Sequence, residues 1–349
     1  MMRHWLPTKW KQLVVVALLA SATTLILFNR QLDRPFWVLT SGRVCAPAHE
    51  ALRELQPVLQ FENRCLFNIL SGNYFVDAYM RMSAEKLPIT IRLRPNGRPV
   101  RKVVLHILGG PGGGSAVPKS WSWANGFAIN PTSTYVENCN AALLMPAYMG
   151  TFERSNYPGS SHEMAEAEVG ALIKRLTDGT SIKTHILADS LGGNIISAPS
   201  IPIPAGQHLL LLPLLKSPNQ TSQYWMERKD FEQQKYYYSK RYIKGSKGYV
   251  LKSVPIWDYF QSYFGSDPIY LRSTFVDRWQ RKTDVAPGTR VHVVIARNDG
   301  RAGGASYAPK LRKLGFTTEI IEGDHEKSDG EDDRVDNAMA WFEKQVCAE

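Results

Sequence analysis

The stretch Leu187-Ala-Asp-Ser190-Leu-Gly192-Gly193 decides the fold, because it joins an apolar strand to a sharp turn. A nucleophile on a strand-to-helix turn needs small residues two positions before and two positions after it, since the turn packs the chain tightly. Ala188 and Gly192 meet this need for Ser190, although the first of these positions is usually glycine. The stretch therefore predicts Ser190 as a nucleophile on such a turn.

Two other interpretations of this stretch have to be weighed. Asp189 is an alternative nucleophile, but the residues two positions away from it are Leu187 and Leu191, which are both too large for such a turn. Ser190 is also compatible with an ordinary serine in a tight turn. The choice between these interpretations depends on the rest of the chain.

A glycine-rich turn, Gly109-Gly110-Pro111-Gly112-Gly113-Gly114, follows the expected strand 103–108. The backbone N–H groups of such a turn can point into a site and stabilise an oxyanion. A phosphate-binding loop is the competing use, but the spacing matches neither GxGxxG nor GxxxxGK[ST]. Together with the serine turn, this segment indicates acyl-transfer chemistry.

A serine nucleophile needs a base, and the base needs a carboxylate that orients it. The histidines that follow the serine turn are His208, His292 and His325. The first two lie at or within expected strands, whereas His325 follows a strand in a loop that can reach the carboxyl edge of a sheet. Asp299 lies between serine and histidine in sequence and also follows a strand. Asp324 is the alternative carboxylate, but it is adjacent to His325 in the sequence, so its side chain is poorly placed to face the imidazole.

Strand-like and helical patterns alternate along the chain. We expect strands at 89–94, 103–108, 141–145, 184–188, 207–212, 291–296 and 317–321. We expect helices at 47–56, 163–176 and 334–346. Buried strands that alternate with helices predict an α/β fold, with a mostly parallel central sheet and helices on both faces.

One long segment, 216–282, interrupts this alternation. It holds 16 aromatic residues, and its thirteen Lys or Arg outnumber six Asp or Glu. Long insertions between strands usually have a function, so we interpret the segment as a lid, with extra core packing as the alternative. The predicted core then comprises 89–215 and 283–349, and 31–88 form an N-terminal extension.

Residues 1–30 are expected to be a signal peptide or a membrane anchor. Basic residues precede the sixteen-residue apolar run 13–28, in the order that is typical of secretory signals. The run is short for a span of about 20 residues, and cleavage after Ala22 would leave an apolar new N-terminus, which favours an uncleaved anchor. Either interpretation places the body of the protein in the periplasm or outside the cell. A buried core helix is the remaining alternative.

Four cysteines, an even number, agree with export. Three pairings are possible, and we favour Cys45 with Cys65 and Cys139 with Cys347. Four free buried thiols would instead fit a cytosolic protein. No CxxC pattern or Cys/His cluster suggests a metal, and catalysis by serine, histidine and aspartate needs none, so we expect no cofactor.

These motifs together resemble the α/β-hydrolase fold superfamily. In detail they resemble its branch with a GGPG oxyanion turn, which includes proline iminopeptidases and tripeptidyl aminopeptidase-like enzymes. The resemblance covers about 89–346 in the order of elements and leaves the lid unmatched. The chain order Ser190, Asp299, His325 is the order of that fold.

The chain departs from that branch at two places. The segment that reads Asp-x-Arg-Gly-x-Gly-x-Ser in the branch is Ala147–Arg154 here, where only Gly150 matches in register. The histidine that often precedes the GGPG turn is Leu108. These departures weaken the assignment to a subfamily and leave the three expected catalytic residues intact.

The resemblance implies a role for each site residue. Ser190 would attack an acyl carbonyl, His325 would take its proton and return it to the leaving group, and Asp299 would orient the imidazole. The backbone N–H groups of Leu191 and Gly110 would stabilise the oxyanion. The predicted function is therefore an exported serine hydrolase for a carboxylic ester or amide.

The charge of the chain bears on its substrate. The net charge is +10, but no Walker A pattern, zinc-finger spacing or RNA-binding motif accompanies it, so we expect no nucleic acid partner. The basic, aromatic lid suits an anionic or aromatic acyl substrate or anionic lipid headgroups, unless its charges form a solvated outer face. Aminopeptidases bind a free amine, which usually calls for carboxylates. The alternatives are an aminopeptidase-like peptidase with a peptide substrate, an acyltransferase, or a noncatalytic cell-surface binding module.

Overall fold

The computed structural model describes residues 37–69, 72–83, 85–109, 139–149, 161–227, 236–242, 249–255, 263–325 and 333–349. The predicted signal or anchor in residues 1–30 lies outside these ranges, as does the glycine-rich turn from Gly110 onward. Within them, no helix combines the length and the apolar character needed to cross a bilayer.

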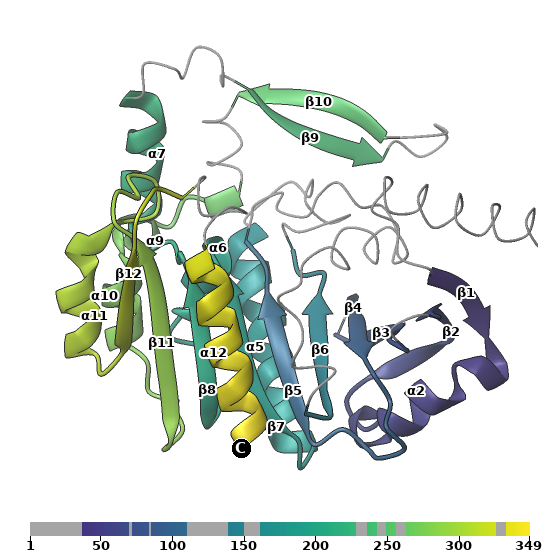
Figure 1. Cartoon of the computed structure of the whole chain (residues 1–349). Helices are drawn as coiled ribbons and strands as arrows, with labels where there is room; N and C mark the ends of the chain where they lie inside the picture. Colours follow the sequence, from purple (N-terminus) through teal and green to yellow (C-terminus); the bar gives the residue numbers. More distant parts are fainter. Residues whose placement is uncertain are drawn as a thin grey trace, which may run out of the picture.

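The main sheet joins ten of the described strands in the order β1-β2-β3-β4-β6-β5-β7-β8-β11-β12 (Figure 1). The bounds are β1 Trp37–Ser41, β2 Gln60–Asn68, β3 Tyr74–Arg81, β4 Lys86–Leu93, β5 Lys102–Ile107, β6 Ala141–Pro146, β7 Lys183–Asp189, β8 Gly206–Leu211, β11 Thr289–Ala296 and β12 Thr317–Ile321. Pairing is antiparallel from β1 to β6 and parallel from β6 to β12. The expected α/β class with a mostly parallel sheet is confirmed.

The parallel strands read as apolar runs because both of their faces are covered. All six residues of β6 are buried, as are the central residues of β7. Figure 1 shows α12 (Asp333–Ala348) on the near face of the sheet, where it packs on β8, and α5 (Ser161–Gly179) on the opposite face, where it packs on β7. The buried residues of α5 recur at helical spacing, at Val169, Leu172, Ile173 and Leu176.

The segment before the predicted core contributes more to the sheet than its sequence indicates. The structure adds β1, β2 and β3 to the sheet, where the sequence predicted only a helix at 47–56. That helix is shorter than expected, with α2 at Ala46–Ala51 and a 3-10 turn at Arg53–Leu55. The first residues of β2, Gln60 to Arg64, are exposed or half-buried and pass through a register shift, so no apolar alternation marks the strand.

The predicted lid contains several separate elements. Helix α7 (Pro218–Glu227) follows β8, and α9 (Pro268–Arg272) and α10 (Phe275–Gln280) precede β11. Between them, β9 (Tyr236–Tyr242) and β10 (Tyr249–Pro255) form their own antiparallel pair. Figure 1 shows this pair above the edge at which the parallel strands end. Its use as a lid stays a prediction.

Two disulfides join the cysteines in the favoured pairing. Cys45 is bonded to Cys65 and Cys139 to Cys347, with Cα–Cα distances of 5.8 and 5.0 Å. The first bond ties the start of α2 to β2, and the second ties the end of α12 to the residue that precedes β6 by two positions. Disulfides of this kind are typical of an oxidising compartment.

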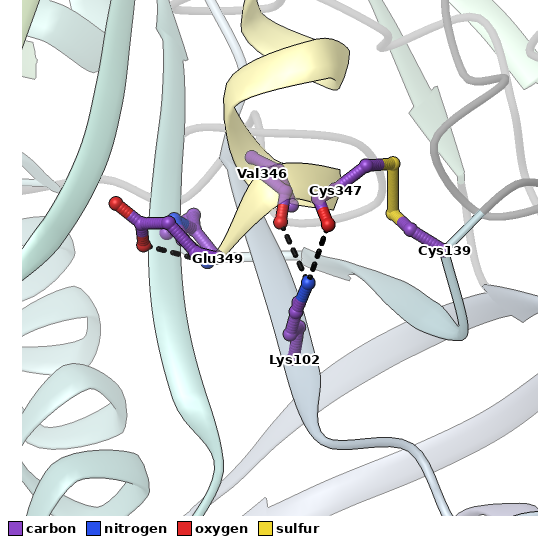
Figure 2. Close-up of a disulfide and its surroundings, with 6 residues drawn as sticks. Lys102, Cys139, Val346, Cys347 and Glu349 are labelled. Atoms are coloured by element: carbon purple, nitrogen blue, oxygen red, sulfur yellow. Dashed lines mark hydrogen bonds and ion pairs between the residues drawn. A yellow bond between two sulfur atoms is a disulfide. The ribbon is translucent and has the colours of Figure 1, made fainter.

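The C-terminal end of α12 is fastened by charge as well (Figure 2). Lys102 of β5 donates to the backbone carbonyls of Val346 and Cys347 at 2.8 and 3.1 Å. These carbonyls lie in the last helical turn, which leaves its oxygens without intrahelical partners. Glu349 pairs with Lys183 of β7 at 2.5 Å. The helix that follows the His325 loop is therefore held to two central strands.

Removing each disulfide tests how much it stabilises the fold. The bonds close loops of 208 and 20 residues, and the chain-entropy model assigns them about 5 and about 3 kcal/mol. We expect the C139S/C347S variant to lower the free energy of unfolding more than C45S/C65S does. Denaturant unfolding under identical conditions measures both. Equal losses, or a larger loss for C45S/C65S, would contradict this order.

Two histidines lie buried and neutral between central strands. The Nδ1 atom of His208 accepts from the backbone N–H of Ile186 at 3.1 Å, and its Nε2 lies 2.8 Å from the carbonyl oxygen of Pro204. His185 Nδ1 accepts from the Gln207 N–H at 3.2 Å. Burial lowers the pKa of both imidazoles to about 4, because a charged ring would lose its hydration there.

This burial makes stability depend on pH. Between pH 6.5 and about 4 the unfolded chain binds a proton at His208 that the folded chain does not, so stability is full above pH 6.5 and falls as the pH decreases. The loss reaches about 3 kcal/mol for this residue. We expect His208→Gln to reduce the difference between unfolding free energies measured at pH 7 and pH 4.5. An unchanged pH dependence in the variant would refute the assignment.

Candidate active site

Ser190 lies on the sharp turn between β7 and α6 (Leu191–Ile196). Its backbone has φ 44° and ψ −113°, a conformation that non-glycine residues rarely adopt and that surrounding structure must hold. The Ser190 N–H donates to the carbonyl of Leu211 at 3.0 Å, and the Leu214 N–H donates to the Ser190 carbonyl at 2.7 Å. Hydrogen bonds to the last residue of β8 and to the segment just after it therefore stabilise the strained residue.

Two glycines, Gly192 after the serine and Gly109 after β5, let this turn pack closely against the end of β5. A Cβ on Gly192 would overlap the carbonyl oxygen of Ile107, at the end of β5. A Cβ on Gly109 would lie 3.2 Å from the Ser190 Cβ. The turn that carries the serine thus packs directly against the strand that leads into the glycine-rich turn.

His325 and Asp299 lie beside Ser190 in one chain of hydrogen bonds. His325 Nε2 lies 3.0 Å from Ser190 Oγ, and His325 Nδ1 lies 2.7 Å from Asp299 Oδ2. A carboxylate only accepts, so Nδ1 carries the proton and Nε2 is free to accept from the serine hydroxyl. Both His325 and Asp299 are buried. The structure brings together the three residues that the sequence selected.

Parallel pairing explains why these residues meet. Ser190, Asp299 and His325 each follow the carboxyl end of a strand, namely β7, β11 and β12. Because β7, β8, β11 and β12 are parallel neighbours, their carboxyl ends share one edge of the sheet. The other two candidate histidines are engaged elsewhere: His208 bonds to Pro204, and His292 lies 3.3 Å from Glu319.

The loop that carries Asp299 is held from two sides. The Ala302 N–H donates to Asp299 Oδ1 at 2.7 Å, which occupies the carboxylate oxygen that does not face His325. Lys216 Nζ donates to the Gly300 carbonyl at 2.5 Å, and the Leu215 N–H donates to the Ala302 carbonyl at 2.7 Å. Leu215 and Lys216, the last residue of the predicted core segment and the first of the predicted lid, therefore hold the loop that carries Asp299.

A buried ionic cluster links α6 to α5 and α10. Arg278 of α10 pairs with Glu166 of α5 and donates to Asn194 of α6 at 2.7 Å. His162 lies 3.2 Å from Arg278, and burial lowers the pKa of this histidine. Such a buried pair is costly to break, because the remaining charge would be uncompensated. The cluster joins the end of the predicted lid to the helix that begins after Ser190.

The two expected oxyanion donors differ in what the structure describes. Leu191 is buried and opens α6, where the first backbone N–H groups of a helix have no intrahelical partner. Gly110 lies outside the described residues, and its role stays a prediction. Among the described residues, no group of three or more His, Cys, Asp or Glu is arranged to hold a metal ion.

Two contacts next to the serine turn were not predicted from the sequence. His106 Nε2 lies 2.7 Å from Asp189 Oδ2, so the residue before the serine is paired across to β5. The Tyr148 hydroxyl donates to the carbonyl oxygen of Leu108. No local signal in the sequence marks the first contact, because the register that places His106 opposite Leu187 is set only when β5 pairs with β7. The second lies in the segment that departs from the resembled branch.

No protein-family model and no curated protein sequence matches the chain. Solved structures with a similar course of the chain include an acetyl xylan esterase from Thermoanaerobacterium sp. (TM-score 0.49, 10% identity, 90% of this chain and 98% of that chain). A bacterial heroin esterase is similar with a TM-score of 0.49 and 14% identity, over 79% of this chain and 84% of that chain. A carboxyl esterase from Tuber melanosporum is similar with a TM-score of 0.48 and 16% identity, over 80% of this chain and 89% of that chain. The site described above does not depend on these likenesses, and the GGPG branch stays a prediction.

Gly192 offers a test of the packing that shapes the turn. We expect Gly192→Ala to cost about 3 kcal/mol or to prevent folding, because the new methyl group meets a backbone carbonyl that cannot move alone. Gly170→Ala, in the middle of α5, is the matched control, since its Cβ would lie 3.4 Å from the Ile201 side chain and alanine favours helix by about 1 kcal/mol. Denaturant unfolding compares the two, and equal stabilities would contradict the close approach.

Proposed function

We propose that the chain is a serine hydrolase that cleaves carboxylic esters or amides through an acyl-enzyme. One observation carries the proposal: the hydrogen-bond chain from Ser190 through His325 to Asp299, with the serine on a strained turn at the carboxyl edge of the sheet. Strain persists at a position only where surrounding structure holds it, and it is concentrated at functional sites.

The geometry suits each step of acyl transfer. Ser190 Oγ attacks the acyl carbonyl carbon while His325 Nε2 takes the hydroxyl proton, and the carbonyl electrons move onto the oxygen. The tetrahedral oxyanion is stabilised by the N–H of Leu191 and by the expected donor Gly110. His325 then gives the proton to the leaving alcohol or amine as the acyl–heteroatom bond breaks.

Deacylation repeats this sequence with water. His325 takes a proton from water, whose oxygen attacks the acyl carbon, and then returns the proton to Ser190 Oγ as the acid leaves. Asp299 keeps the Nδ1 proton in place and stabilises the imidazolium that forms in both halves. The second bond from Ala302 to Asp299 restricts the carboxylate to this orientation.

The wider setting of the proposal is export with an anionic or aromatic acyl substrate. Two disulfides suit an oxidising compartment outside the cytoplasm. The segment between β8 and β11 is basic and aromatic in sequence, which favours an ester or amide with an acidic or aromatic acyl group over the free amine of an aminopeptidase substrate. An acyltransferase would use the same three side chains.

Covalent labelling tests the proposed nucleophile. We expect a fluorophosphonate to label the wild-type chain and not Ser190→Ala, because only an activated hydroxyl reacts with it. Asp299→Asn should still fold and should lower kcat by about 10⁴, since the imidazole would take the wrong tautomer. Gel fluorescence measures the labelling, and hydrolysis of p-nitrophenyl esters measures kcat.

A matched serine keeps this test specific. Ser197→Ala alters a buried serine just after α6, whose hydroxyl donates to the Asn194 carbonyl, and should leave labelling unchanged. Folded wild-type chain that is neither labelled nor active would point to a noncatalytic binding module. Transfer of the acyl group to an added alcohol, faster than to water, would point to an acyltransferase.

A further inference from the structure

Tyr148, which follows β6, contacts the backbone just after β5. Tyr148 is fully buried, and its hydroxyl donates to the carbonyl oxygen of Leu108, the first residue after β5. The next residue is anchored too, since the Met149 N–H donates to Glu168 of α5 at 2.8 Å. A buried side chain from one strand end thus holds the backbone of another.

The peptide that Tyr148 holds is in contact with the nucleophile. Gly109, which is bonded to Leu108, approaches so closely that its Cβ would lie 3.2 Å from the Ser190 Cβ. The Leu108 carbonyl oxygen also borders Gly192, where an added Cβ would lie 2.8 Å away. The Leu108–Gly109 peptide is therefore enclosed between the serine turn and the tyrosine hydroxyl.

The surroundings keep Tyr148 a donor. Burial raises the pKa of its hydroxyl well above 10, and Tyr263 and the Asp189 carboxylate raise it further. The phenol therefore retains its proton at neutral pH and can donate to the Leu108 carbonyl. Because Leu108 is buried, water would not replace this donor at its carbonyl oxygen if the hydroxyl were removed.

We propose that Tyr148 is a positioning residue, whose hydroxyl holds the Leu108–Gly109 peptide against Ser190, immediately before the expected oxyanion donor Gly110 in the sequence. The inference rests on the proposed hydrolase function and deepens it. An oxyanion donor acts on charge that develops only in the transition state. A small displacement of the Leu108–Gly109 peptide, which precedes the expected donor, therefore lowers kcat and leaves substrate binding unchanged.

Tyr148→Phe tests this role in the full-length chain. We expect kcat for p-nitrophenyl acetate to fall about tenfold, a part of the 10²–10³ lost when an oxyanion donor is removed, while KM changes less than about twofold. The affinity for phenylboronic acid, which forms a tetrahedral adduct with the serine, should fall by a factor similar to kcat. A purely structural role would not link these two losses.

Tyr263→Phe is the matched control. Tyr263 is also buried, and its hydroxyl has no hydrogen-bond partner within the part of the chain that the structure describes, so the same atom is removed without breaking a described bond. We expect wild-type kcat and boronate affinity for this variant. Wild-type kcat in folded Tyr148→Phe, or a rise in KM alone, would overturn the positioning role.

A second variant covers the case in which Tyr148→Phe does not fold. Glu168→Ala releases the Met149 N–H and loosens the same segment from the side of α5. We expect a lower kcat and a weaker boronate with unchanged KM, and wild-type values would count against the proposal. Absence of esterase activity and of fluorophosphonate labelling in the wild type would instead refute the hydrolase function itself.

Discussion

The close approach of Gly192 to the end of β5 is the constraint on which the site depends. No Cβ fits between this residue and the Ile107 carbonyl, so α6 can lie directly against the strand. That approach forces the chain to reverse within one residue, and Ser190 takes the positive φ that the reversal requires. The cost of this conformation is offset by backbone hydrogen bonds to β8 and by the buried helix that follows.

Everything else in the site is brought to this turn by the order of the sheet. Four parallel neighbours end at one edge, and the loops after β11 and β12 deliver the carboxylate and the imidazole to the serine. The residues after β8 hold the Asp299 loop, and the disulfide and Lys102 hold the end of α12, the helix that follows His325 in the sequence. The geometry is over-determined, as a preorganised site requires.

The insertion between β8 and β11 is part of this support. Its first residues bond to the loop of Asp299, and Arg278 near its end bonds to Asn194 of α6. A segment that the sequence marks only as long, basic and aromatic thus touches both the acid loop and the nucleophile helix. Its two ends are integral to the core, whatever its middle part contributes to substrate binding.

The sequence by itself determined the α/β class and the choice of Ser190, Asp299 and His325, because strand periodicity, turn chemistry and chain order can be read from it directly. It favoured the observed cysteine pairing among three possible ones without excluding the other two. The tertiary structure alone decided that β1 to β3 extend the sheet, since the exposed start of β2 carries no apolar alternation. It also decided that Tyr148 meets Leu108 and that His106 meets Asp189. These contacts join residues 40 and 83 positions apart, and only the packing of neighbouring strands brings such residues together.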